Sequence, residues 1–311
     1  IFRSLRSLQM RRLRLALALR RNPMTFCIYS GLDVANSEMS IEHIFPLTLG
    51  GSDAYTVNVS KSSNGLANRE IDEKLKSCFF LATNRKKHGA LGHRKTAVCP
   101  PKAKITVGGD KSVVFKFDEN DLLQFYSNKR KKIIGLDEIK TDGASFSIEE
   151  QISIGLKFTA KVGLAAGYFS YGDVFVEHTK TDDLRALMNY AGSRYDKSNF
   201  DKITSTGWHW PYPVRDLDSN MHRVFQIMND MFNSSFVALI TSAVPDKIII
   251  AVGILGHLIG VIACPANCDA FPKSGDHDLG HVAVLNDKRL QTMSFRNCLK
   301  KIVTYSGEKN G

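Results

Sequence analysis

Apolar and polar residues follow different periods in different parts of the chain. Between residues 147 and 170 the apolar residues recur every three or four positions, and Ser147 with Glu150 has the form of a capping box, so this stretch predicts a helix. The same spacing predicts a short helix over residues 182–190. From His222 onward, short apolar runs alternate with Pro, Gly and Asn, which predicts strands. These strands are expected at residues 223–228, 235–241, 247–254, 258–263 and 281–285.

The longest apolar run extends from Ile248 to Cys264. It has 17 residues, whereas a helix needs about 20 to span a bilayer, and it contains His257 and three glycines. β-Branched residues dominate the run and Gly256 interrupts it, which favours two buried strands. We therefore expect no membrane-spanning segment and no membrane partner.

In the first third of the chain, the sequence patterns that predict helices, strands and turns are shorter. A short apolar stretch precedes His43, a Gly-Gly turn follows at residues 50–51, and residues 64–76 have helical spacing. Residues 84–104 carry seven basic residues, two prolines and no acid, as in a linker. The apolar residues 104–107 and 112–117 flank Gly-Gly-Asp, which predicts a β-hairpin.

These patterns predict an α+β protein. We expect a first module over residues 24–82, and a basic linker over residues 83–104. An α+β domain with an antiparallel sheet is expected over residues 105–311. Residues 1–23 stand apart as a basic arm or a non-native segment.

Charge and composition narrow the classes of protein. The formal charge is +11, but residues 1–23 hold seven arginines and no acid, so the rest of the chain is only mildly basic. That arm could follow phosphates, target an organelle, or precede the true start of the protein. With 43% hydrophobic and 23% charged residues, disorder and collagen are excluded. Six cysteines without a dense framework indicate a reducing compartment, and we expect a cytoplasmic location.

Candidate chemistry is concentrated between Cys27 and Leu75. Glu42-His43 follows a short strand and precedes Ile-Phe-Pro, which holds the histidine where strand turns to loop. The Gly-Gly turn comes next, and then a polar segment opens a helix with Asn64 and Asn68 one turn apart.

This arrangement resembles an HNH endonuclease, a member of the ββα-metal family. The resemblance covers about 50 of the 311 residues, and His43 lies 21 positions before Asn64, a spacing typical of that module. It implies that His43 is the general base, Glu42 a metal ligand and Asn64 a second ligand at the helix start. Asn58 would take the middle position that aims the histidine, and Asn68 competes with Asn64.

Many members of that family carry a zinc knuckle, and this chain retains only its outline. Cys27-x-x-Ser30 and Ser60-x-x-Ser63 occupy the frame of two C-x-x-C pairs, with three thiols replaced by serine. Serine hydroxyls are poor zinc ligands, so we expect no structural zinc in the module. Packing alone would then hold it, through Phe26, Tyr29, Ile44, Leu47, Phe79 and Phe80.

Phosphodiester hydrolysis needs a base for water and a hard cation for the growing negative charge. Neutral histidine suits the first task near pH 7, and carboxylate and amide oxygens suit Mg²⁺ or Mn²⁺. We therefore expect a metal-dependent DNA endonuclease, by analogy in restriction or phage defence. A non-catalytic nucleic-acid-binding protein with a decayed module, an RNA nuclease, and a homo-oligomer remain alternatives. Phosphate contacts are expected from Arg85, Lys86, Lys87, Arg94 and Lys95, and from the basic run 129–132.

Two further clusters have ordinary structural explanations. Cys264, Cys268, His277 and His281 are zinc-ligand types, but the eight residues between the pairs are fewer than usual, which favours a polar loop. The aromatic segment 208–212 could stack bases, although such clusters more often fill a core.

Overall fold

The computed structural model describes residues 23–92, 97–101, 103–120, 122–147, 153–190, 202–209 and 219–310. Helices and strands are mixed, and in this part of the chain the strands form antiparallel sheets of two, two, five and six strands. The predicted mixture of helices with antiparallel sheet is therefore confirmed.

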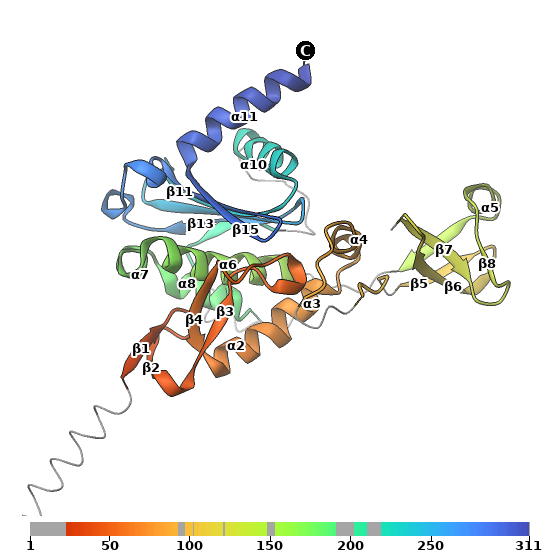
Figure 1. Ribbon diagram of the computed structural model, residues 1–311, viewed down its shortest axis with the longest axis horizontal. Helices are drawn as coiled ribbons and strands as arrows, with labels where there is room; N and C mark the ends of the chain where they lie inside the picture. Colours follow the sequence, from red (N-terminus) through yellow and green to blue (C-terminus); the bar gives the residue numbers. More distant parts are fainter. Residues whose placement is uncertain are drawn as a thin grey trace, which may run out of the picture.

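A six-stranded antiparallel sheet forms the centre of the larger body (Figure 1). Its order is β10-β13-β12-β11-β14-β15, and helices cover both faces. On one face lie α6 (Ile154–Tyr171), α7 (Asp173–His178) and α8 (Thr181–Met188), and on the other α10 (Ser219–Phe232) and α11 (Phe295–Asn310). The strands are β10 (Thr206–His209), β11 (Ser235–Val244), β12 (Lys247–Ile254), β13 (His257–Pro265), β14 (Gly280–Asn286) and β15 (Arg289–Ser294).

Both faces of this sheet are buried, which explains its continuous apolar runs. Along β11, Val237 and Leu239 pack under α6, whereas Phe236 and Ala238 pack under α10 and α11. The run 248–264 forms β12 and β13 as predicted. Among the described residues, every helix is too short or too polar to cross a bilayer.

Two predictions in this half were wrong. Residues 223–228 lie in α10, because their apolar side chains continue a helical spacing that buries Phe225 and Met228 against the sheet. The helix predicted from Ser147 begins at Ile154, since Ser147 ends a strand. Glu150, the other half of the proposed capping box, lies outside the described residues.

The N-terminal segment forms two β-hairpins followed by helices. The predicted helix at residues 64–76 starts three residues earlier, because Ser60 caps it by accepting a hydrogen bond from the Ser63 amide at 3.1 Å. The elements are β1 (Met24–Cys27), β2 (Leu32–Ala35), β3 (Met39–His43), β4 (Thr56–Ser60), α2 (Lys61–Ala67), a wider π-helical turn (Asn68–Asp72), α3 (Glu73–Lys76) and α4 (Phe79–Lys87). Short 3-10 turns lie at Asn36–Glu38, Leu47–Leu49, Cys268–Ala270 and Gly275–His277.

The N-terminal segment does not have a core of its own. Ile44, Phe45 and Val59 belong to the same buried cluster as Phe158 of α6 and Ile250 of β12. Because α6 packs on both the hairpin and the large sheet, residues 24–82 and the C-terminal half form one body.

Residues 104–147 instead form a small lobe beside α4 (Figure 1). Its own core contains Ile105, Val113 and Phe115, and Phe79 of α4 packs against Phe115 with ring centroids 5.2 Å apart. The predicted hairpin is confirmed as its first two strands, and the first residues of the predicted linker are helical. The lobe contains β5 (Lys104–Val107), β6 (Asp110–Phe117), β7 (Leu123–Ser127), β8 (Lys132–Ile133), α5 (Leu136–Asp142) and β9 (Ala144–Ser147).

Candidate functional site

The β3–β4 hairpin separates two residues that were expected to act together. Cross-strand partners share a face, and the partners are Ile41 with Asn58, Glu42 with Val57, and His43 with Thr56. Side chains alternate along a strand, so His43 and Asn58 lie on one face of the hairpin and Glu42 lies on the other. The open face carries His43, and the covered face buries Glu42, which is 7% exposed.

His43 pairs with a residue that the sequence did not indicate. Its Nε2 lies 2.8 Å from Oδ1 of Asp53, in the loop between β3 and β4. A carboxylate only accepts hydrogen bonds, so Nε2 is the donor in this pair. The histidine is mostly buried, and Asp53 is almost fully exposed. The sequence feature that could have indicated Asp53 is an aspartate directly after Gly-Gly-Ser.

The loop that supplies Asp53 is fixed to the large sheet. Ser52 donates to the carbonyl of Lys288 in the β14–β15 turn at 2.6 Å. Gly50 has a φ of +83°, and a side chain on Gly51 would collide with the Phe45 carbonyl. The predicted Gly-Gly turn is therefore required by geometry, and it holds the loop next to His43.

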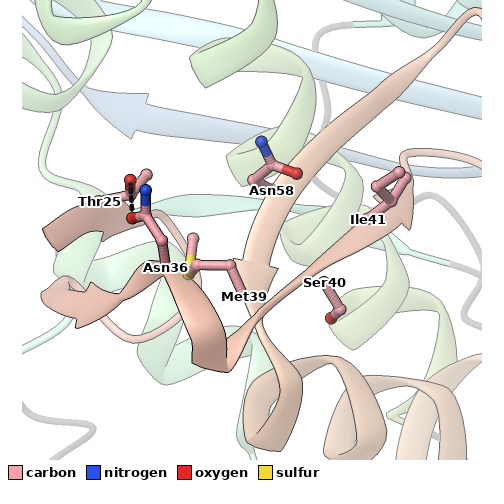
Figure 2. A pocket seen from close by; sticks show the side chains of 6 residues that line it. All are labelled: Thr25, Asn36, Met39, Ser40, Ile41 and Asn58. Carbon is pink, nitrogen blue, oxygen red and sulfur yellow. Dashed lines mark hydrogen bonds between the residues drawn. The ribbon is translucent and has the colours of Figure 1, made fainter. Parts of the chain in front are cut away.

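Asn58 lies on the open face of the hairpin. It lines a shallow pocket of about 260 Å³ together with Ile41 and other residues of the two hairpins (Figure 2). At the far end of the pocket Thr25 donates to Asn36 at 2.6 Å. Asn58 shares its face with His43, as the middle motif residue would.

The two helix asparagines have different positions. Asn64 uses its amide nitrogen to donate to Ser40 Oγ at 3.0 Å and to the Ile41 carbonyl at 3.1 Å. It therefore joins α2 to β3 two residues before His43. Asn68 is exposed in the π-helical turn. Contact with the hairpin thus distinguishes Asn64 from its competitor.

Glu42 takes part in a buried ion triad with Lys161 and Asp72. The Lys161 ammonium lies 2.6 Å from Glu42 Oε1, and it donates to both carboxylate oxygens of Asp72 at 2.6 and 2.8 Å. Burial lowers the pKa of Lys161, but the two carboxylates outweigh it and the net shift is upward. Burial also raises the pKa of Asp72 to about 6 despite the opposing effect of Lys161.

The expected Mg²⁺ or Mn²⁺ does not fit this arrangement. Glu42, the predicted ligand, faces the interior and already neutralises an ammonium. Across the described ranges, His, Cys, Asp and Glu side chains form no group of three that could hold a metal ion. The pair His43 and Asp53 remains on the open face.

The four positions of the zinc-knuckle frame do lie together. Cys27 Sγ accepts a hydrogen bond from the Ser60 amide at 3.2 Å, and Ser60 Oγ donates to Ser63 Oγ at 2.8 Å. Ser30 also hydrogen-bonds the Cys27 sulfur. We call Cys27, Ser30, Ser60 and Ser63 the serine cluster. The expectation that packing alone holds this segment was therefore wrong, because hydrogen bonds take part.

Of the side chains expected to pack the module, Tyr29 and Ile44 are buried, whereas Phe80 is 51% exposed. Phe79 packs on the small lobe instead. The apolar packing of residues 24–82 therefore comes mainly from side chains in or next to the two β-hairpins.

The expected phosphate contacts are only partly available. Arg85 is 8% exposed, and its guanidinium donates to the carbonyls of Thr48, Lys76 and Ala90. Its guanidinium therefore binds the backbone of the protein, and its predicted contact with nucleic acid stays a prediction. Lys87 is exposed and Lys86 is half-buried, whereas Arg94 and Lys95 lie outside the described residues.

In the basic run 129–132, two of the four side chains bind acids of the small lobe. Arg130 and Lys132 both pair with Glu138, at 2.6 and 2.8 Å. The run therefore supports α5 as well as presenting charge to solvent.

The other clusters behave as ordinary packing. His277 and His281 stack with ring centroids 5.0 Å apart, and both contact Tyr171. Trp208 packs edge-on to His222, while residues 210–212 lie outside the described residues.

Searches against protein-family models, curated proteins and solved structures find no match to this chain.

Proposed function

We propose that this protein is an HNH-type endonuclease that hydrolyses phosphodiester bonds in DNA, with His43 as the general base. One observation carries the proposal: at the end of β3, on the open face of a ββα unit, His43 is paired through Nε2 with Asp53. A histidine oriented by a carboxylate is a common arrangement for a base that accepts a proton from a nucleophile.

In this proposal the imidazole of His43 takes a proton from the attacking water, and Asp53 stabilises the imidazolium that forms. The Ser52 contact to Lys288 and the Gly-Gly turn hold Asp53 in place. Asn64 positions β3 through the carbonyl of Ile41. These residues act on the base and its orientation, and Asn58 lies beside the path along which a strand would approach.

Mg²⁺ or Mn²⁺ remains the cofactor that we expect for the reaction, because charge develops on the phosphate. The ion triad shows that Glu42 is not available as its ligand in this arrangement. Restriction or phage defence is the setting in which we place the enzyme, by analogy alone.

The proposal is tested with purified protein, supercoiled plasmid, linear DNA and RNA, each with Mg²⁺, Mn²⁺ or EDTA. We expect nicking or linearisation of DNA, reduced about 100-fold or more in His43→Ala because general bases contribute that much. Asp53→Asn should lose less, since the imidazole remains. His178→Ala removes a histidine at the end of α7 and serves as the matched control.

Equal cleavage by His43→Ala and by the wild-type protein would contradict the proposed mechanism. Preferential cleavage of RNA would retain the base and change the substrate class. DNA binding without cleavage, under every cation condition, would favour the second candidate.

That second candidate is a non-catalytic nucleic-acid-binding protein. The observation that favours it is the burial of Glu42 in the ion triad, which removes a carboxylate that the motif expects at the metal. The oriented His43 favours the enzyme, because a decayed site has no need for a histidine held by Asp53.

A further inference from the structure

The ion triad has the oxygen donors of a hard-cation site around the nitrogen of a lysine. The Lys161 ammonium has three carboxylate oxygens of Glu42 and Asp72 within 2.8 Å. All three residues are at least nine-tenths buried, and Lys161 is fully buried. Carboxylates with this degree of burial need a cation beside them.

We infer that Lys161 is a built-in cation that takes the place of a divalent metal ion between Glu42 and Asp72. Because Lys161 pairs with Glu42, this carboxylate would not be a ligand in the cofactor site of the proposed nuclease. This pairing holds whether or not the protein cleaves DNA.

The oxygens around the ammonium match its donors in number. Lys161 donates hydrogen bonds to both oxygens of Asp72, and Glu42 Oε1 lies 2.6 Å from the same nitrogen. An ammonium has three N–H donors, while Mg²⁺ or Mn²⁺ takes about six oxygen ligands. The two carboxylates therefore suit the ammonium, and a metal ion in its place would need water for its remaining ligands.

The ammonium is held by a helix that cannot easily withdraw it. Lys161 lies in the middle of α6, whose residues from Phe158 to Gly167 are all buried. This helix packs against β12 and β13 on one side and against β4 and α3 on the other. The cation is therefore part of the core that joins the hairpin to the large sheet.

The test measures Mn²⁺ binding to the full chain without nucleic acid, by electron paramagnetic resonance and by calorimetry. Glu42→Gln alone, with Lys161 in place, should have an Mn²⁺ affinity within twofold of that of the wild-type protein. Lys161→Ala removes the ammonium and leaves room for an ion with water, so it should bind Mn²⁺ at least tenfold more tightly than wild type. Adding Glu42→Gln to Lys161→Ala should abolish that gain.

Lys157→Ala is the matched control, because Lys157 is also buried on α6, one turn earlier, and it should gain nothing. A tenfold weaker Mn²⁺ affinity in Glu42→Gln than in wild type would overturn the inference, and this comparison does not require Lys161→Ala to fold. A folded Lys161→Ala protein without gained affinity would overturn it as well. The Mn²⁺ affinities of Glu42→Gln and Lys161→Ala do not depend on DNA cleavage, so a failure of the proposed function is recognised separately.

Discussion

The serine cluster and the ion triad both involve residues 24–82, and their polar groups find partners in different ways. In the serine cluster, the Ser60 amide donates to Cys27 Sγ and the Ser60 hydroxyl donates to Ser63 Oγ, so neutral groups bind one another. In the ion triad, an ammonium from α6 lies between Glu42 and Asp72. The first cluster is made within the hairpins and α2, whereas the second recruits a side chain from a distant helix.

The difference predicts unequal sensitivity to mutation. Neutral hydrogen bonds contribute about 1 kcal/mol each, and leaving one buried donor or acceptor without a partner costs about 1–3 kcal/mol. Removing one partner of a buried ion pair leaves a charge without compensation, at a cost of about 3–5 kcal/mol. The ion triad should therefore be more sensitive to the loss of one side chain than the serine cluster.

The largest expected effect is from Lys161→Met. The change keeps the length of the side chain and leaves Glu42 and Asp72 buried together without a cation. We expect a loss of about 3–5 kcal/mol in the free energy of unfolding, measured by urea denaturation.

Lys157→Met is its control. Lys157 is 6% exposed, and burial lowers its pKa, so the same substitution there removes a poorly solvated ammonium. It should change stability by less than about 1 kcal/mol. Equal losses in the two variants would show that the comparison between triad and serine cluster reflects only packing of α6.

The second prediction concerns cysteines in place of the three serines of the serine cluster. Changing Ser30, Ser60 and Ser63 to cysteine should convert the serine cluster into a four-thiolate zinc site, because the four positions already converge. With free zinc at 100 times its dissociation constant, the unfolding free energy should rise by about 2.7 kcal/mol. Co²⁺ spectra of a tetrahedral thiolate site check the geometry. A triple variant that binds no Co²⁺ would show that the frame is only a sequence outline.

Several elements could be predicted from sequence because their signals are local. The apolar runs that became β12 and β13, the Gly-Gly turn and the hairpin around Gly108 all follow from patterns within about ten residues. The strand predicted at residues 223–228 failed because a six-residue apolar stretch fits either period, and only packing on the sheet decides.

The site was predictable only where the motif is contiguous. His43 and Asn58 were candidates from the sequence and lie on one face of the hairpin, but Asp53 was missed because an aspartate in a polar turn is common. The partner of Glu42 could not be found from sequence, since Lys161 lies 89 residues beyond Asp72 in an apolar helix. The burial of Arg85 could not be predicted, because charge alone does not show whether a guanidinium faces solvent or carbonyl groups.

The smallest expected effect concerns the thiol of the serine cluster. Burial raises the pKa of Cys27, but hydrogen bonds from Ser30 and Ser60 outweigh it, and the pKa ends below its ordinary value of 9.0. Between the lowered pKa and 9.0 the folded protein binds fewer protons than the unfolded chain. Stability should therefore rise with pH in this window, and Cys27→Ser should lose that rise.

The comparison with Cys298 isolates the effect, since burial raises the pKa of that thiol to about 12. Between pH 7 and pH 9 the folded thiol stays protonated while the unfolded one begins to ionise, so this thiol should make stability fall as pH rises, and Cys298→Ser should lose that fall. Urea denaturation at several pH values in this range gives the difference between each variant and the wild type. A difference for Cys27→Ser that is flat with pH, or that has the same sign of slope as the difference for Cys298→Ser, would contradict the hydrogen-bonded thiolate, and the serine cluster would then stabilise the hairpin only as a neutral cap.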